Sequence, residues 1–346
     1  MNAKDLHYTM PAEWTAHERT FLSWPVQASM VYPEDYSAVS QGYEDLVHAI
    51  AEFEPVTVIV NPSDAEQVKA RFTEDNVEFL VIAHNDAWFR DNGPTFLLNA
   101  QGQIAGVNWK FNAWGGKYSP WDLDDAVAPQ VLEHYGIQRL DAPLVMEGGS
   151  IHVDGEGTLL TTEECLLNPN RNPELSRAQI EELVKNFVNV DKIIWLKRGL
   201  DGDETDGHVD NIACFAAPGR VILQVCHDPA DENYEITQEN LSILRQATDA
   251  RGRALDIIQI EQPPKTFFGE QRLTLSYLNF YFVNGGIILP VFGGTAEAAD
   301  REAVRVLGEA FPDRRIRTID GMSIIKEGGN VHCTTQQMPA SARVRA

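Results

Sequence analysis

Short apolar runs rich in β-branched residues alternate along this chain with longer amphipathic segments. One run occupies residues 56–60 and ends at Asn61-Pro62, a pair that stops a strand. The same composition recurs at intervals, and runs of this length bounded by turn residues are typical of β-strands. We therefore expect strands at residues 56–60, 77–82, 104–111, 158–162 and 192–196.

Two pairs of apolar runs are separated by turn dipeptides, Pro218-Gly219 and Asn284-Gly285. Asn-Gly is a strong hairpin signal because both residues tolerate the positive φ angles of a tight turn. Each pair therefore predicts two antiparallel strands. The expected strands are residues 212–215 with 221–225, and residues 278–283 with 287–291.

Four longer segments place apolar residues at helical spacing between polar or proline boundaries, and we expect helices at residues 36–53, 173–187, 231–250 and 295–311. With the hairpins they form a repeated hairpin-plus-helix unit. Alternating strands and helices favour a parallel sheet, whereas the hairpin turns indicate antiparallel pairing, so the pattern leaves the sheet type open. No Ser/Gly-rich linker divides the chain, which favours a single domain over residues 1–346.

Composition and charge narrow the function classes. The chain has 346 residues, 43% of them apolar, and a net charge of −23. This charge repels nucleic acid and anionic membranes and would steer a small cation into a cleft, although acidity also serves solubility. No apolar run of about 18 residues occurs, and residues 1–7 lack a signal-peptide pattern. We expect a cytoplasmic protein with no nucleic-acid or membrane partner.

The four cysteines are scattered and form no Cys-x-x-Cys pair. This distribution favours reduced thiols over a disulfide framework or a zinc site. Three of them lie in or beside apolar runs, where a buried thiol behaves as a small apolar side chain. We expect these three in the core: Cys165, Cys214 and Cys226.

Cys333 differs because it follows the glycine-rich string Glu327-Gly328-Gly329-Asn330-Val331-His332. A related string, Glu147-Gly148-Gly149-Ser150-Ile151-His152, is followed by Val153 instead. The two strings predict one backbone element that occurs twice and carries a thiol once, as expected of a catalytic site placed on a repeated fold. Cys333 is the candidate nucleophile.

A polar segment at residues 203–211 precedes the apolar run that begins at Ile212. In an extended segment His208 and Asp210 would project on one face, where imidazole could transfer protons and the carboxylate could bind a cation. The alternatives are a strand-entry turn with a hydrogen-bonded structural histidine, or a calcium loop, although the EF-hand spacing is absent.

A third segment, residues 88–94, joins an apolar pair to an Arg-Asp pair and a turn before a strand resumes at Thr95. Asp91 could face the cationic part of a substrate. Alternatively, Arg90 and Asp91 belong to a structural ion-pair network and Trp88 packs in the core.

Taken together, these strings resemble the agmatine deiminase family, within the larger group of guanidino-modifying enzymes that includes bacterial-type peptidylarginine deiminase. The sequence departs from the family pattern at Glu327, where a further glycine is usual, and at Gly293-Gly294-Thr295, where an acidic or asparagine-rich turn is more familiar. The similarity runs almost end to end, through residues 10–14, 21–25, 88–94, 112–116, 147–154, 161–173, 206–211 and 328–337.

The resemblance implies the pentein fold, a five-bladed α/β propeller of ββαβ-type units around a pseudo-fivefold axis, as one domain. It assigns Cys333 as the nucleophile, His208 and Asp210 as the proton-transfer pair, and Asp91 as the remaining carboxylate. It also implies a cofactor-free hydrolase that converts agmatine to N-carbamoylputrescine and ammonia through an S-alkylthiouronium intermediate, in polyamine (putrescine) metabolism.

The rest of the substrate needs apolar walls for its methylene chain and a carboxylate for its distal ammonium. Trp88 and Trp114 are candidate walls. Glu147 could brace the site rim through its glycine-rich turn, or be ordinary turn composition. Candidates for the ammonium, each also explicable as turn chemistry, are Asp203, Glu204 and, least directly, Asp206.

Other classes stay open. A peptidylarginine deiminase or another guanidino hydrolase is the close alternative. A metal-dependent hydrolase would use His208, Asp210, Asp91 and Glu147, but it would give Cys333 no task, and the chain has no His-x-x-x-His motif. A non-catalytic agmatine-binding protein is a further alternative. A homodimer is expected only because symmetric dimers are common.

Overall fold

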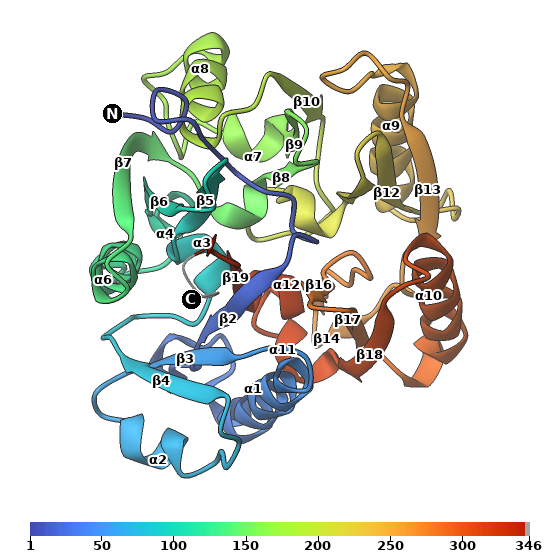
Figure 1. The fold of residues 1–346 in the computed structure, drawn as a ribbon. Helices are drawn as coiled ribbons and strands as arrows, with labels where there is room; N and C mark the ends of the chain where they lie inside the picture. The colour runs from blue at the N-terminus through green and yellow to red at the C-terminus, as the bar shows by residue number, and fades with distance from the viewer. Residues whose placement is uncertain (343–346) are drawn as a thin grey trace.

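The computed structural model describes residues 1–342, and its strands form five sheets of three or four strands and one two-stranded hairpin. Five times, an antiparallel strand pair is followed by a helix and a strand that returns parallel to the second strand of the pair. The helices of these units lie on the periphery of the molecule, and the strands lie inside them (Figure 1). The sheets are therefore mixed, and each crossover uses a helix, as parallel pairing requires.

Four of the units follow one another along the chain. Their elements are β5 (Thr95–Asn99), β6 (Ile104–Lys110), α6 (Val127–His134) and β7 (Gln138–Val145); β8 (His152–Val153), β9 (Thr158–Thr162), α8 (Arg177–Val188) and β10 (Lys192–Leu196); β11 (Ala213–Ala217), β12 (Arg220–Val225), α9 (Asn233–Gln246) and β13 (Asp256–Glu261); and β16 (Tyr281–Val283), β17 (Gly286–Val291), α10 (Glu297–Ala310) and β18 (Arg315–Asp320).

The fifth unit joins the two ends of the chain. Strand β19 (Thr335–Pro339) pairs antiparallel with β2 (His17–Ser23), so that Thr335 lies opposite Leu22. Helix α1 (Tyr36–Ala51) then leads to β3 (Val56–Val60), which is parallel to β2 and to β4 (Val77–Val81). Cys333 lies two residues before β19, so this pairing of distant segments fixes the approach to the thiol.

The remaining elements are short. They are β1 (Tyr8–Thr9), η1 (Gln27–Ser29), η2 (Pro33–Asp35), α2 (Ala65–Lys69), α3 (Phe89–Asn92), α4 (Ala113–Gly116), α5 (Asp122–Asp125), η3 (Gly148–Ser150), α7 (Glu163–Leu166), η4 (Val209–Asn211), β14 (Phe267–Phe268), β15 (Gln271–Arg272), η5 (Gly294–Ala296), α11 (Met322–Ile325) and α12 (Val331–Thr334). Several of them, including α3, α4 and α12, lie toward the middle of the molecule (Figure 1).

The predicted hairpins form at the expected turns. Gly219 and Gly285 have φ angles of 77° and 73°, which a side-chain-bearing residue rarely adopts. The four predicted helices also form, with shorter ends. Helix α8 begins at Arg177, because Ser176 and Gln179 make a capping box that sets its N-terminus.

One local prediction is wrong. The segment from His208 to Asp210 is not extended, because Val209–Asn211 forms the single 3-10 turn η4 and the following strand begins at Ala213. The two side chains therefore do not share a strand face. Instead the turn brings Asp210 toward Cys333, as the contacts below show.

None of the helices that the structure describes is long and apolar enough to span a bilayer.

Candidate active site

Cys333 is held by two asparagine side chains. Asn330 caps the one-turn helix α12 by accepting a hydrogen bond from the Val331 amide at 3.0 Å. Asn279 accepts from the His332 amide at 2.9 Å through Oδ1, and its Nδ2 donates to the Cys333 sulfur at 3.0 Å. The thiol is therefore fixed by polar contacts, although only 4% of Cys333 is exposed.

His208 is completely buried, and neither of its ring nitrogens has a hydrogen-bond partner among residues 1–342. Its ion-pair contacts are longer: Nε2 lies 3.5 Å from Glu147 Oε2, and Nδ1 lies 3.8 Å from Asp91 Oδ1. Burial by itself lowers the pKa of His208, but Asp91, Cys165 and Glu147 outweigh burial and raise it well above its ordinary value. This arrangement disfavours a satisfied structural histidine and favours a buried proton donor.

Asp91 is held in the turn α3 by two donors. The Gly149 amide donates to Oδ1 at 3.0 Å, and Trp114 Nε1 donates to Oδ2 at 2.9 Å. Burial raises the pKa of Asp91 to about 6, His208 opposes this, and Glu147 and Asp210 add to it. Arg90 makes no ion pair with Asp91; it contacts Glu13 at 3.4 Å instead.

Asp210 uses only one of its oxygens within the described residues. Oδ2 accepts from His332 Nδ1 at 2.9 Å and lies 3.4 Å from the Cys333 sulfur, whereas the buried Oδ1 has no partner there. Burial raises the pKa of Asp210, but His332 and His208 lower it below its usual range. Asp210 is thus an ionised carboxylate with a free oxygen beside the thiol.

Two glycines let these groups come together. A Cβ on Gly149 would lie 2.7 Å from His208 Nδ1, 2.9 Å from Asp210 Oδ2 and 3.0 Å from Asp91 Oδ1. A Cβ on Gly329 would lie 2.5 Å from the Trp88 ring. Steric crowding therefore explains why each glycine-rich string has glycine at this position, since any side chain would occupy the space between the functional groups.

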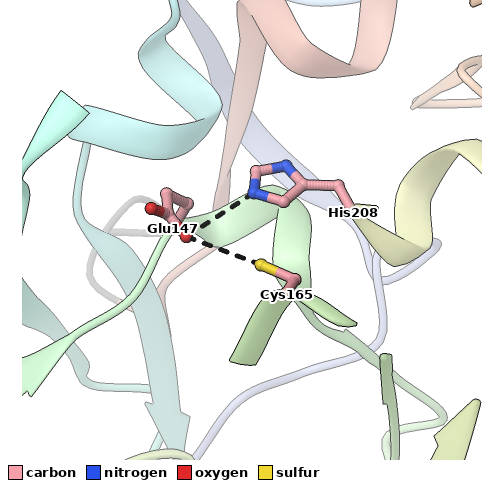
Figure 2. A group of neighbouring side chains, drawn as sticks. All are labelled: Glu147, Cys165 and His208. Atoms are coloured by element: carbon pink, nitrogen blue, oxygen red, sulfur yellow. Dashed lines mark hydrogen bonds and ion pairs between the residues drawn. The ribbon is translucent and has the colours of Figure 1, made fainter. Parts of the chain in front are cut away.

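Glu147 lies behind His208 rather than at a rim. It is fully buried, and Arg171 Nε donates to its Oε1 at 2.7 Å. Figure 2 shows its other oxygen between His208 and Cys165, whose sulfur is 3.9 Å away. Burial raises the pKa of Glu147, but His208 and Arg171 lower it below its ordinary value. Glu147 is therefore the anion that faces the protonated imidazole.

This cluster is a poor metal site. Glu147, Cys165 and His208 have ligand atoms within 4.8 Å of one another, but Arg171 already neutralises Glu147 and places Nη2 4.0 Å from the Cys165 sulfur. A resident cation would compete with this guanidinium. Asp91 and Asp210 are engaged by tryptophan and histidine donors, as described above.

A cavity opens above the thiol. Cys333 and Asp91 line it together with the rings of Trp88 and Trp114. Three further carboxylates also line the cavity: Asp86, Glu204 and Glu327. The lining residues include no Arg or Lys among those that the structure describes. The cavity thus combines apolar rings with anionic groups, which suits a cation that carries an apolar chain.

The three candidate carboxylates at residues 203–206 have different surroundings. Glu204 lines the cavity and accepts a hydrogen bond from the Tyr118 hydroxyl. Asp203 instead accepts from the amide and hydroxyl of Thr205 at 2.9 and 2.6 Å. Asp206 binds Arg171 Nη1 at 2.7 Å and Lys117 Nζ at 2.6 Å. Only Glu204 of the three lines the cavity.

Sequence reasoning missed several residues of the site. Asn279 contacts the nucleophile but was read as part of an apolar strand; a polar residue between Leu278 and Phe280 was the available signal. Asp86 lines the cavity without belonging to a candidate constellation, and Glu327, which begins the string before Cys333, lines it without having been assigned a role. The other three cysteines are buried as expected, and all four are free thiols.

The chain matches a known family model, that of the Porphyromonas-type peptidyl-arginine deiminase, over residues 9–339. The chain belongs to this family. Among members of similar sequence, the agmatine deiminase of Stutzerimonas stutzeri is 44% identical, with 96% of each chain covered. The solved agmatine deiminase of Enterococcus faecalis has a TM-score of 0.93 and 36% identity, with 98% of each chain covered.

The fold extends beyond close relatives in the Porphyromonas-type family. A dimethylarginine dimethylaminohydrolase structure has a TM-score of 0.51 at 12% identity and covers 93% of this chain. That likeness concerns the fold alone. It agrees with a mixed α/β architecture of the pentein superfamily.

Proposed function

We propose that this protein is an agmatine deiminase, which hydrolyses agmatine to N-carbamoylputrescine and ammonia. The observation that carries the proposal is the buried thiol of Cys333 beside Asp210, whose second oxygen has no partner among the described residues, in the wall of a cavity that Asp91 and three further carboxylates also line. Relatives at 42–44% identity over 96% of the chain are named agmatine deiminases, which supports the same activity here.

The guanidinium group would lie between Asp91 and Asp210. Each carboxylate would accept N–H bonds from it, fix its plane beside the sulfur and keep it cationic and electrophilic. The buried, unsatisfied Oδ1 of Asp210 supports this placement, because a buried acceptor without a partner is costly unless a ligand completes it.

Covalent catalysis would proceed in two stages. In the first, the Cys333 thiolate attacks the guanidinium carbon and His208 gives its proton to the departing nitrogen. Ammonia is then lost, and an S-alkylthiouronium intermediate remains on Cys333. In the second, neutral His208 takes one proton from water as it attacks the same carbon. Cleavage of the C–S bond then releases the ureido product, and the remaining hydroxyl proton passes to the sulfur, which regenerates the thiol. The raised pKa of His208 suits the first stage.

The thiol would be activated by the substrate. Burial, Asp210 and Asp91 raise the pKa of Cys333 well above its ordinary value, so the free enzyme holds a thiol. The entering guanidinium supplies positive charge beside the sulfur, and the thiol proton is released as the thiolate forms.

Agmatine fits the cavity better than arginine does. Trp88 and Trp114 would flank the methylene chain, and Glu204 would meet the distal ammonium. Arginine would bring an α-carboxylate toward Asp86, Glu204 and Glu327 with no lining Arg or Lys among the described residues to pair with it. A peptidylarginine deiminase is the second candidate, since the matching family model carries that name.

We further propose that the five hairpin-helix-strand units are the blades of a pseudo-fivefold propeller and that residues 1–346 form one domain. The support is the fivefold recurrence of the same pairing order. We also propose a cytoplasmic homodimer that acts in putrescine metabolism, with support from the absence of a spanning helix among the described residues and the commonness of twofold dimers.

The decisive experiment measures ammonia release by the wild type and by Cys333→Ala with agmatine, free arginine and a blocked arginine peptide, each with and without a chelator. We expect chelator-resistant turnover of agmatine that is lost in the variant. Turnover of the peptide would assign a peptidylarginine deiminase, and activity in Cys333→Ala would exclude the covalent mechanism.

A further inference from the structure

His332, the neighbour of the nucleophile, is enclosed by two carboxylates. Its Nδ1 lies 2.9 Å from Asp210 Oδ2, and its Nε2 lies 2.9 and 3.1 Å from the two oxygens of Glu13. All three side chains are 3% exposed or less. Because a carboxylate faces each ring nitrogen, both nitrogens must donate, and the ring is an imidazolium.

We propose that His332, anchored by Glu13, is the positioning residue of Asp210: its imidazolium occupies Oδ2, keeps the carboxylate ionised and leaves Oδ1 for the substrate guanidinium. This inference rests on the proposed deiminase function and deepens it. His332 itself need not touch the substrate, because its effect passes through Asp210.

The position of Glu13 explains why a second carboxylate is present. A lone buried imidazolium beside Asp210 would share its charge with one partner, whereas Glu13 holds the far side of the ring and fixes its orientation. Glu13 is itself fixed, since Arg90 Nη1 lies 3.4 Å away and His152 Nε2 lies 3.7 Å away. Burial raises the pKa of Glu13, but His332, Arg90 and His152 lower it well below its ordinary value.

The same network reaches β19, the strand that follows the nucleophile. Arg90 donates to the His332 carbonyl at 3.2 Å, to Gln336 at 3.1 Å and to Gln337 at 3.1 Å. The charged and titratable groups around His332 are therefore Asp210, Glu13, Arg90 and His152. Cys333 and His208 interact with Asp210, and Cys214 interacts with Glu13. These groups come from several separate elements, so the imidazolium sits at their junction.

Loss of the imidazolium would change the proton affinity of Asp210. Burial and the nearby Asp91 both favour the protonated carboxyl, and His332 is the group that opposes them most strongly. Without it, the pKa of Asp210 would rise. A protonated Asp210 would bind guanidinium poorly at neutral pH. Binding would recover at higher pH, because Asp210 would then ionise.

The test is the pH profile of kcat/KM for His332→Asn. Asparagine keeps a donor on the Asp210 side and loses both the charge and the reach to Glu13. We expect kcat/KM at neutral pH to fall about 10- to 100-fold, with the acidic limb moved to higher pH so that the deficit shrinks as the pH rises. An unchanged limb would overturn the proposal.

The matched control is His152→Asn. His152 also borders Glu13, but its Nδ1 accepts from the Phe215 amide at 3.2 Å and it makes no hydrogen bond or ion pair with Asp210. Because His152 can act on Asp210 only through Glu13, its variant should move the limb much less than His332→Asn does, and an equal shift in both variants would reduce His332 to a structural role. If His332→Asn does not fold, Glu13→Gln should move the limb in the same direction by a smaller amount; no movement would again overturn the proposal.

A second readout separates this inference from the proposed function. Chloroacetamidine is a small cation that alkylates thiols and should be guided by Asp91 and Asp210, whereas iodoacetamide is neutral. Mass spectrometry of Cys333 should show the wild type reacting preferentially with the amidine and His332→Asn losing that preference. This result holds even if the wild type fails to release ammonia from agmatine, which would refute the substrate assignment alone.

Discussion

Asp91 and Asp210 both lie close to the same point beside Gly149, yet the site shifts the pKa values of the two carboxyl groups in opposite directions. Burial raises the pKa of Asp91 to about 6, whereas the pKa of Asp210 is lowered by His332 and His208 despite burial. Asp91 therefore takes up a proton first as the pH falls, and the free enzyme loses one of its two guanidinium acceptors.

The acidic limb of kcat/KM should consequently reflect Asp91, with activity falling below a pH of about 6. Trp114→Phe removes the indole hydrogen bond that stabilises the ionised Asp91, so the limb should move to higher pH. Trp109→Phe is the control, because Trp109 donates to Thr95 instead. Superimposable limbs for wild type and Trp114→Phe would contradict this account.

The thiol of Cys333 should ionise only when a guanidinium-bearing ligand binds, because burial and two carboxylates raise its pKa. A slowly reacting analogue should therefore increase the ultraviolet absorbance of thiolate and release a proton to the buffer. Cys333→Ala should show neither signal. A strong thiolate absorbance in the ligand-free wild type would mean that the thiolate is preformed.

Gly149→Ala should abolish most activity, with a loss of at least about 100-fold. The added methyl would lie within 3.0 Å of His208, Asp210 and Asp91 and displace the groups that hold the guanidinium. Gly308→Ala in α10 is the control, because its nearest contact would be 3.8 Å away. Circular dichroism should show both variants folded; near-normal turnover by Gly149→Ala would argue against this tight arrangement.

Glu204→Gln should raise KM for agmatine about tenfold with a smaller change in kcat. The reason is that Glu204 lines the cavity beyond the reacting centre and would pair with the distal ammonium. Butylguanidine lacks that ammonium, so its kinetics should be unaffected. Equal effects on both substrates would point to a disturbed cavity wall, and exposed Glu309→Gln provides the charge-matched control.

Glu327 should fix the segment that contains Val31, a residue of the cavity wall. Its carboxylate accepts from the Val31 amide at 2.6 Å and the Tyr32 amide at 3.3 Å. Lys326 adds an ion pair of 2.7 Å to Asp35. Glu327→Gly should accelerate hydrogen exchange at Val31 and Tyr32, with unchanged exchange in α8 as the internal control. Unaltered exchange at both amides would show that the loop needs no such anchor.

The sequence predicted the repeating elements well because hydrophobic period and turn residues are local signals. Strands β3, β9 and β10 have the expected bounds, and both hairpins turn where Gly219 and Gly285 predict. The strings with Cys333 and Asp91 also identified residues that line one cavity, and the string with His208 identified a buried residue that contacts Asp91. Local pattern was sufficient for these features.

Contacts between distant segments were not predictable in the same way. His332 and Glu13 form a contact although they are 319 positions apart in the sequence, and the residues on either side of each give no sign that the two side chains meet. The turn η4 replaced the expected extended segment because Asp210 is held by contacts to His332 and Cys333 rather than by its own propensity. Tertiary contacts decide the local conformation in such segments, and neither the hydrophobic period nor the composition of the sequence predicts those contacts.

The pairing of β2 with β19 also bears on how the enzyme is made. A ribosome delivers Asp91, Glu147, His208 and Asp210 long before Cys333, and the strand that follows the thiol docks on residues synthesised at the very beginning. A partly synthesised chain thus carries the acids and the imidazole but no nucleophile. Catalytic competence appears in one late step, and loss of a few terminal residues of β19 would remove it while most of the units could already have formed.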